Sequence, residues 1–475
     1  MGGLRLKAGF SKFSFGIFLL VIFFTVFILS GCKRDSSTEK EIQIQGPVYE
    51  ENGLPKNQKV VLRIIYPEQG YGTEFFEKGI KSFEEKFPNV KCEVRYVSGG
   101  IVSYNNIVQS LIQANNDEDM FDWFYAFPDG SRMIASGKLE TQDEIWEKTF
   151  YDTPNVKIID GILGEKRELV SSDGHSYSIP NQLGIVGLFY NRGMFKQLGL
   201  QERPSDWNEF LEVCSKIKAS GTYPMVMAGK FPGYFEYGWG AIPYEIEGDH
   251  FWDAQYYKKP DLYLYKGYVT MLERLQEFTE NGYLHPGTIS FDHTQSQMEF
   301  LQGKGAMITN GAWIAKEMED VIPKGFEWGF MPFPGNESGQ QQVVLIHHGS
   351  IGFIWKNRPE LNKKWAKEFN RWLLNLELQK IVAKNGAMPA RKDFPKSFDN
   401  LSPSLRAAMQ TIREKNVRIL NNRVAAKSLN GVEAAKIGKV KRDCLVAVVS
   451  GKMNAVTAAK ETNAQYMKAF KAQKD

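Results

Sequence analysis

Six histidines and 55 acidic side chains could take part in acid–base or metal chemistry in this 475-residue chain. Their spacing matches no HExxH, GxSxG, P-loop or GxGxxG motif. His347 and His348 are adjacent, and neighbouring side chains on a strand point to opposite faces, so one metal site could not easily use both. The many carboxylates leave a glycosidase pair open. We expect no enzymatic activity and no cofactor, and an exported polysaccharide-active enzyme is the less favoured alternative.

Cys32 has the clearest chemistry, because it ends a long segment without charge. Arg5, Lys7 and Lys12 come first, and no charged side chain occurs from residue 13 to residue 32. This order is typical of a secretory signal peptide, although about 19 uncharged residues could also form a transmembrane helix. Small residues at positions 30 and 31 favour the signal peptide, since a peptidase needs a narrow backbone beside the bond that it cuts.

The segment LSGC at residues 29–32 resembles a bacterial lipobox. The resemblance implies that diacylglycerol is transferred to the Cys32 sulfur and that the chain is cleaved before Cys32. Acyl chains contribute about 0.8 kcal/mol of membrane affinity for each buried CH₂ group. We therefore expect an exported protein that a lipid holds at the extracellular face of the cell membrane.

The residues after Cys32 begin as a linker and continue as a globular protein. Residues 33–59 are rich in Ser, Glu, Gln, Lys, Asn, Gly and Pro, a composition typical of a solvated tether. Loss of residues 1–31 removes three cations and lowers the formal net charge from +4 to +1, so no nucleic-acid partner is expected. An apolar content of 43% is ample for two cores in a chain of this length.

The three cysteines beyond Cys32 are widely spaced and belong to no CxxC motif. We expect Cys92, Cys214 and Cys444 to be small buried hydrophobic residues. One disulfide with a leftover thiol remains the alternative.

Strands and helices are predicted to alternate along the chain. Residues 60–66 form a β-branched run that Pro67 ends, and apolar residues at helical spacing predict a helix over 73–87. A second strand is predicted over 90–97. This order is the start of a βαβ arrangement.

Two further helices are predicted from their apolar spacing and end signals. Ser205 is expected to cap a helix that Gly221 ends. Residues 363–384 are expected to form one long helix, which the segment GAMP at 386–389 ends.

Five short segments follow one another in a recognisable order: FEEKFPNVKCEV at 83–94, DGHSYSIP followed by LFYNR within 173–192, PSDWNEF at 204–210, GKGAMITNGAW at 303–313 and GAMPA at 386–390. This order resembles the extracellular solute-binding proteins of carbohydrate ABC importers, the family that includes maltose-binding protein. Each segment alone is a weak signal, whereas five in the family's order are a strong one. The resemblance covers nearly the whole chain after the leader.

The resemblance implies an α/β fold, a type II clamp of two lobes like that of periplasmic binding proteins, with crossing hinge strands and a ligand cleft between the lobes. It assigns 1–31 to a signal peptide, 32–58 to lipidated Cys32 and a flexible tether, 59–183 plus 346–398 to lobe 1, and 184–345 plus the C-terminal helices of 399–475 to lobe 2.

Aromatic residues are the first candidates for sugar contacts, because a rigid ring covers the apolar C–H face of a sugar at low entropic cost. Trp313 matches the tryptophan that stacks on a sugar ring in the family, and the alternative is a role in the core of a lobe. Tyr234, Tyr237 and Trp239 lie in a glycine-rich loop, and we expect at least one of them to line the cleft.

Polar candidates come from the same resemblance. Asp129 matches a sugar-binding carboxylate of the family, although exposed loop aspartates are common. Glu68 and Tyr71 lie in the loop that faces the cleft in relatives, and a solvated Glu68 is the alternative. Asp122 matches an acidic residue that is normally structural, so we do not expect it to bind ligand.

One position departs from the family pattern. The maltose protein has a sugar-binding glutamate where this chain has Gly184, with Asn181 and Gln182 just before it. We count these two amides as candidate ligands and do not expect maltose specificity.

The expected function is that of a monomeric receptor without chemistry of its own. The resemblance implies that it captures a sugar or oligosaccharide outside the cell and presents it to the permease subunits of an ABC transporter. A lipid anchor with a polar tether suits a Gram-positive surface. A tethered sugar sensor or adhesion protein that serves no transporter is the main alternative.

Overall fold

The computed structural model describes residues 46–68, 72–128, 130–163, 170–171, 173–256, 258–337, 339–394, 401–421, 429 and 432–472. Residues 42–475 form one compact unit. Cys32 and the predicted signal peptide lie outside the described residues, as do Tyr71 and Asp129. In the described part of the chain, no helix is long and apolar enough to cross a membrane.

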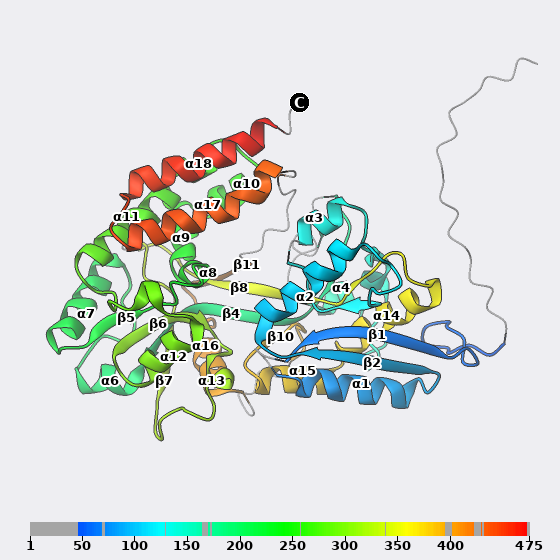
Figure 1. Ribbon diagram of the computed structural model, residues 1–475. Coiled ribbons are helices and arrows are strands. Elements are labelled where there is room, and N and C mark those ends of the chain that lie inside the picture. Colours follow the sequence, from blue (N-terminus) through cyan, green and yellow to red (C-terminus); the bar gives the residue numbers. More distant parts are fainter. Residues whose placement is uncertain are drawn as a thin grey trace, which may run out of the picture. The chain divides into compact units, whose positions relative to one another are not determined.

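The first lobe contains a four-stranded sheet in the order β2-β1-β3-β9 (Figure 1). Its strands are β1 (Val60–Pro67), β2 (Val90–Val97), β3 (Trp123–Phe124) and β9 (Phe353–Ile354). Strand β1 is parallel to both β2 and β3, and helix α1 (Glu74–Lys86) connects β1 to β2. The predicted strand, helix and strand at this end of the chain are therefore confirmed.

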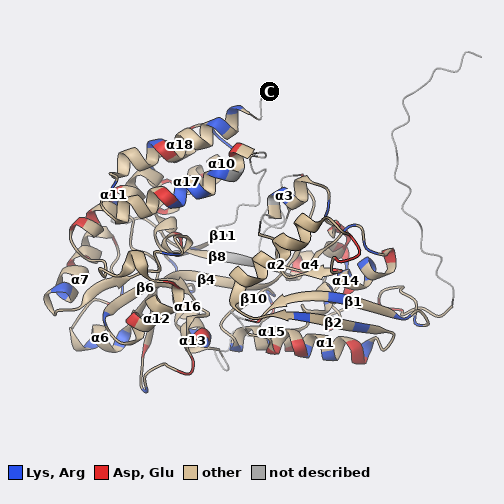
Figure 2. Ribbon diagram, viewed as in Figure 1, with Lys and Arg blue, Asp and Glu red and all other residues tan. Residues whose placement is uncertain are grey.

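Helices α1, α2 (Gly100–Ala114), α14 (Glu360–Trp372) and α15 (Leu376–Lys384) belong to this lobe. Acidic and basic residues share the exposed side of α1 (Figure 2), and Glu74 pairs with Lys78 and Lys384 at 3.0 Å. The shorter elements of this part of the chain are α3 (Gly130–Ala135), η1 (Asp143–Glu147) and α4 (Ile158–Gly161).

The prediction of one long helix over 363–384 is wrong, because the chain breaks between α14 and α15. The break is stabilised by side chains from elsewhere in the sequence. The Leu376 N–H donates to the Asp152 carboxylate (2.5 Å), and the Leu374 carbonyl accepts from the buried guanidinium of Arg391 (3.1 Å). Backbone groups that leave the helix are thus satisfied, so the break costs little.

The composition of residues 46–58 predicted a solvated tether, and this prediction is wrong. These residues pack against the first lobe. Tyr49 and Leu54 are buried in the core of the first lobe. The Tyr49 hydroxyl donates to the Asn89 side chain (2.8 Å), and the Tyr49 ring packs edge-on against Phe87 at 4.9 Å. We name residues 46–58 the N-terminal strap.

Asp122 has the structural role that was expected of it. Its fully buried carboxylate accepts from the Arg63 backbone N–H (2.8 Å) and from the Arg358 guanidinium (2.7 Å). These bonds tie β1, β3 and the start of α14 together.

The second lobe is built on a seven-stranded sheet among the described residues, with the path β11-β8-β4-β6-β5 and two short strands, β7 and β10, paired to β4. The strands are β4 (Ile179–Asn191), β5 (Tyr223–Val226), β6 (Gly305–Gly311), β7 (Trp328–Met331), β8 (Gln342–Ile351), β10 (Met388–Pro389) and β11 (Val417–Asn421).

One residue separates the two sheets at the end of β8. Ile351 ends β8 of the second sheet, Phe353 begins β9 of the first, and Gly352 lies between them with φ +84°. A Cβ atom at Gly352 would lie 1.9 Å from the Asn370 side chain, so only glycine fits. The Gly352 carbonyl accepts from Asn370 and Gln142, both at 2.8 Å.

Many of the helices of the second lobe come between its strands: α6 (Arg192–Gln197), α7 (Trp207–Ala219), α8 (Gly233–Glu236), η2 (Trp239–Ala241), α9 (Ile242–Glu247), α10 (Asp249–Tyr256), η3 (Leu262–Leu264), α11 (Lys266–Glu280), η4 (Thr288–Ser290), α12 (His293–Leu301), α13 (Ile314–Glu317) and α16 (Pro403–Thr411). The last two helices, α17 (Val432–Val449) and α18 (Ala455–Lys471), pack together against α11 (Figure 1).

The predicted cap of α7 is off by one residue. Asp206, not Ser205, is the N-cap, and its carboxylate accepts from the Glu209 N–H (3.1 Å). Ser205 instead donates its backbone N–H to the Glu209 carboxylate (2.7 Å). Either residue type can cap a helix, and these contacts decide between them.

The cysteines in the described residues are all free, which confirms the prediction of unpaired thiols. Cys214 and Cys444 are buried, whereas Cys92 is half-buried on β2. Burial raises the pKa of Cys214 and Cys92 above the ordinary thiol range, which favours the protonated thiol over the reactive thiolate.

Candidate ligand-binding site

Trp313 lies at a turn between β6 and α13. The turn is fixed from both sides, because the Ala312 N–H donates to the Ile185 carbonyl of β4 (2.9 Å) and the Asn310 side chain accepts from the Gly311 N–H (2.7 Å). Gly386 approaches so closely that a Cβ there would lie 2.8 Å from the Ala312 carbonyl. The indole is half-buried, so part of it remains available to a ligand.

Trp313 is one of five half-buried rings that come from three parts of the second lobe. We name these rings the Trp313 cluster: Phe231, Tyr234, Tyr237, His293 and Trp313. Ring centroids are 5.8 Å apart between Trp313 and Tyr237, and 4.8 Å apart between Tyr237 and Tyr234. His293 lies 5.3 Å from Phe231 and 6.5 Å from Tyr234. The cluster therefore offers several ring faces and edges, as contact with sugar C–H groups requires.

A half-buried carboxyl group borders the cluster. Glu317 follows Trp313 by one helical turn, and its carboxylate accepts from the Gln297 amide (2.8 Å). Burial raises the pKa of Glu317 to about 7, although the Gln297 hydrogen bond opposes the shift. The pKa of Tyr234 is raised, chiefly by burial and to a smaller extent by the charge of Glu317. The Tyr234 hydroxyl accepts a hydrogen bond from the Trp313 indole. Polar groups and aromatic faces thus adjoin one another here.

Trp239 lies in the core, not in the cluster. It is fully buried and packs against Phe333 (4.3 Å), Phe278 (5.4 Å) and Trp207 (5.9 Å). Contrary to the sequence-based expectation, it offers no exposed face to a ligand. Tyr234, from the same glycine-rich loop, belongs to the cluster.

Asn181 and Gln182 lie on β4, where this strand pairs with β10, and both are 1% exposed. Gln182 donates to the Tyr125 hydroxyl of the first lobe (3.4 Å). Both polar atoms of the Asn181 side-chain amide lack a hydrogen-bond partner among the described residues. A buried amide in that state is costly, and this conformation shields both residues from a ligand.

Glu68 directly follows β1 and lines a pocket of about 450 Å³ that both lobes form. Glu68 and Tyr96 come from the first lobe, and Lys316 and Glu319, at and beyond the end of α13, come from the second. The Ser98 hydroxyl donates to the Glu68 carboxylate. The structure thus places Glu68 and the helix that follows Trp313 on the same opening.

Sequence reasoning missed Phe231, His293, Gln297 and Glu317. Two of these residues lie four positions after another residue of the site. Gln297 follows His293 at this interval on α12, and Glu317 follows Trp313. Residues four apart on a helix share a face. That spacing does not predict that α12 and α13 lie side by side. Their contact is visible only in the folded structure.

A family model described as "Bacterial extracellular solute-binding protein" matches residues 69–380. The chain therefore belongs to the bacterial extracellular solute-binding protein family. Its α/β fold has the two lobes expected of that family, with open sheets.

Two curated proteins and one solved structure show the range of its relatives. The "Multiple sugar-binding protein" of Streptococcus mutans serotype c is 27% identical over 327 residues, which are 66% of this chain and 72% of that protein. The "sn-glycerol-3-phosphate-binding periplasmic protein UgpB" of Brucella abortus is 24% identical over 345 residues, or 69% and 75% of the two chains. A structure entitled "Chitin oligosaccharide binding protein" superposes with a TM-score of 0.68 at 19% identity, covering 87% of this chain and all of that one.

Proposed function

We propose that this protein captures a sugar or oligosaccharide outside the cell and delivers it to the permease subunits of an ABC transporter. The main observation in support is the half-exposed Trp313 cluster beside the polar pair Glu317 and Gln297. The names of the streptococcal relative and of the chitin-oligosaccharide protein support the same ligand class. The protein acts as a receptor, and no catalytic step is needed.

Aromatic and polar side chains of the site would contact different parts of the sugar. Ring faces of Trp313 and Tyr237 would cover the C–H faces of the sugar, while Glu317 and the neighbouring amides would bond its hydroxyls. Rotation of the lobes about Gly352 would close the pocket that Glu68 lines over the bound sugar. Asp129 and Tyr71 are also proposed to contact the sugar in this cleft.

We keep the predicted lobe boundaries as part of the proposal, with one change. Lobe 1 comprises 59–183 and 346–398, and the N-terminal strap is added to it. Lobe 2 comprises 184–345 and 399–475. Strands β4 and β8 of its sheet cross these boundaries as hinge strands, and β10, which pairs with β4, lies inside the lobe 1 range.

A lipid on Cys32 is proposed as the membrane anchor of a monomeric receptor at a Gram-positive cell surface. Cys32→Ala removes the sulfur nucleophile, so metabolic labelling with a fatty acid should mark the wild-type chain and not the variant. Cys92→Ala serves as the matched control and should label normally. Labelling of Cys32→Ala at the wild-type level would contradict the anchor.

A thermal-shift screen of neutral mono- and oligosaccharides, with sn-glycerol 3-phosphate included, tests the ligand class. A bound ligand stabilises the folded protein by RT ln(1 + [L]/Kd), so the correct sugar should raise the melting temperature in a concentration-dependent way. A response to sn-glycerol 3-phosphate alone would refute the sugar assignment. Small-angle scattering with the sugar that binds should then show a smaller radius of gyration, and an unchanged radius at saturation would refute closure.

A further inference from the structure

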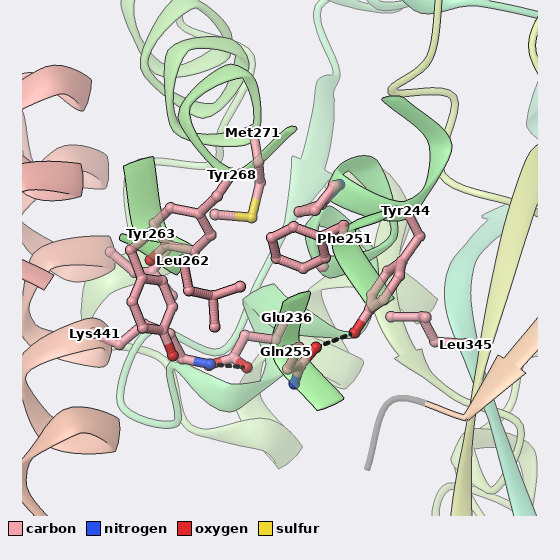
Figure 3. A pocket seen from close by; sticks show the side chains of 13 residues that line it. Glu236, Tyr244, Phe251, Gln255, Leu262, Tyr263, Tyr268, Met271, Leu345 and Lys441 are labelled. Atoms are coloured by element: carbon pink, nitrogen blue, oxygen red, sulfur yellow. Dashed lines mark hydrogen bonds and ion pairs between the residues drawn. The ribbon is translucent and has the colours of Figure 1, made fainter. Parts of the chain in front are cut away.

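We propose that lobe 2 contains a second binding site, separate from the Trp313 cluster, for a small uncharged molecule with a ring that bears hydroxyl groups on one edge. The site is a cavity of about 100 Å³ between α9, α10, α11 and α17 (Figure 3). An apolar cavity of roughly 150 Å³ can hold benzene. At about 100 Å³ the cavity has room for at most one small ring, with its hydroxyl groups at the open edge, and not for an oligosaccharide.

Most of the wall is apolar and suits one face of a ring. Five hydrophobic side chains supply much of it: Phe251, Leu262, Met271, Leu345 and Leu445. A monosaccharide has hydroxyls all round its ring, and several of them would lose their hydrogen bonds against this wall. Burial of an unpaired hydroxyl is unfavourable, so the wall disfavours a sugar.

Polar groups gather along one edge of the cavity (Figure 3). The Tyr244 hydroxyl donates to Oε1 of Gln255 (2.6 Å), so the Nε2 group of the same amide can donate to a ligand. Beside it, Nζ of Lys441 lies 2.8 Å from the Glu236 carboxylate. An edge with both donors and acceptors matches a hydroxyl group, which donates and accepts at once.

The charges on that edge cancel each other. Burial lowers the pKa of Lys441, but the nearby Glu236 carboxylate and Tyr263 outweigh burial and keep it above its ordinary value. The ammonium and carboxylate thus stay ionised as a pair, and an ionic ligand would find no free countercharge. The side chains of Lys441 and Glu236 are 22% and 32% exposed, which leaves this edge open to solvent as an entrance.

Calorimetric titration of the full chain in detergent with resorcinol tests the site, with a blank titration into detergent alone. Resorcinol is uncharged at pH 7 and carries both hydroxyls on one side of its ring. The matched probes are 3-hydroxybenzoate, which adds a negative charge, and glucose, which is polar all round. We expect saturable 1:1 binding of resorcinol and binding weaker by about tenfold or more for both other probes.

A methyl group can be added to the cavity without strain elsewhere. A Cβ at Gly240 would lie 3.5 Å from Leu345 and 3.6 Å from Glu236, both ordinary contacts, and both residues line the cavity. Gly240→Ala should weaken the binding of resorcinol by about tenfold, because an added methyl group overpacks a site that the ligand already fills. Gly130→Ala is the control, since a Cβ there meets nothing within 4 Å.

Three outcomes would overturn the proposal: no saturable resorcinol binding, equal affinity in Gly240→Ala and the wild type, or loss of binding in Trp313→Ala. Loss of binding in Trp313→Ala would show that resorcinol binds at the Trp313 cluster. Retained resorcinol binding by Trp313→Ala supports a separate site, whether or not a sugar ligand is found for the cluster.

Discussion

The Trp313 cluster of lobe 2 and the aromatic core of lobe 1 consist of the same kinds of ring at the same spacing, but only the first is exposed. In lobe 1, Phe87 lies 5.0 Å from Trp365, and Phe83 lies 5.2 Å from Phe369. These four side chains are fully buried, whereas every ring of the Trp313 cluster is half-buried. Ring type and packing distance therefore do not distinguish a partly exposed cluster from a core.

The difference arises from what covers each set of rings. In lobe 1, α1 and α14 bring the rings together and the N-terminal strap adds Tyr49, 5.8 Å from Trp365. In lobe 2 the rings come from a short helix, a turn and the start of α12. The same contrast separates Trp239 from Tyr234, which lie five residues apart in one loop.

The largest effect is expected from Trp365→Ala. Removal of a fully buried tryptophan should lower the free energy of unfolding by about 3–5 kcal/mol, because a cavity replaces its contacts. Urea unfolding of the chain without ligand measures the loss. The affinity of the folded fraction for its sugar should stay close to that of the wild type, and a lost affinity with intact stability would reverse the roles given to the two regions.

Trp313→Ala should have the opposite profile. Loss of a stacking partner should weaken sugar binding by on the order of 1–3 kcal/mol, or roughly 5- to 150-fold. Stability without ligand should fall only slightly, since the ring is already partly exposed. Urea unfolding and calorimetry, run side by side, decide the matter. A large loss of stability with an unchanged dissociation constant would make Trp313 a core residue.

A separate effect should appear in the pH dependence of stability. Burial raises the pKa of Glu317 beside the cluster to about 7 and that of Glu245 in the core of lobe 2 to about 8. The folded protein then holds more protons than the unfolded chain between the ordinary carboxyl pKa and these values. Each group's stabilisation is therefore complete below pH 4.5 and is lost as the pH rises through the folded pKa.

Gln keeps the shape of each protonated carboxyl but does not titrate. The difference in unfolding free energy between the wild type and Glu317→Gln should decline up to about pH 7, and that for Glu245→Gln up to about pH 8. Urea unfolding from pH 5 to pH 9 provides the comparison. A difference that stays constant over this range would show that the carboxyl is already ionised in the fold.

Local patterns were sufficient for part of the fold. The β-branched run and the helical spacing of phenylalanines predicted β1, α1 and β2, because each signal lies within its own element. The break before α15 was missed because Asp152 and Arg391, which stabilise it, are distant from it or lie beyond it in sequence. The strap was missed because its polar composition conceals two anchors, Tyr49 and Leu54.

The candidate site was predictable only where the family motif includes the residue. Trp313 was found through such a motif, and Tyr234 through an aromatic loop that also contains the buried Trp239. Glu317 is an ordinary surface-type residue in the sequence. In the fold it is half-buried and accepts a hydrogen bond from Gln297, on a helix that the sequence does not connect to it.

The N-terminal strap determines where a mechanical load enters the protein. The Asn89 amide donates to the carbonyls of Pro55 (3.1 Å) and Gln58 (2.9 Å), and Arg371 donates to the carbonyl of Glu51 (3.1 Å). Tension applied to the chain before residue 46 would therefore load hydrogen bonds that all lie within lobe 1. These hydrogen bonds join the strap to lobe 1, so such a pull would reach lobe 2 only through the chain connections between the lobes.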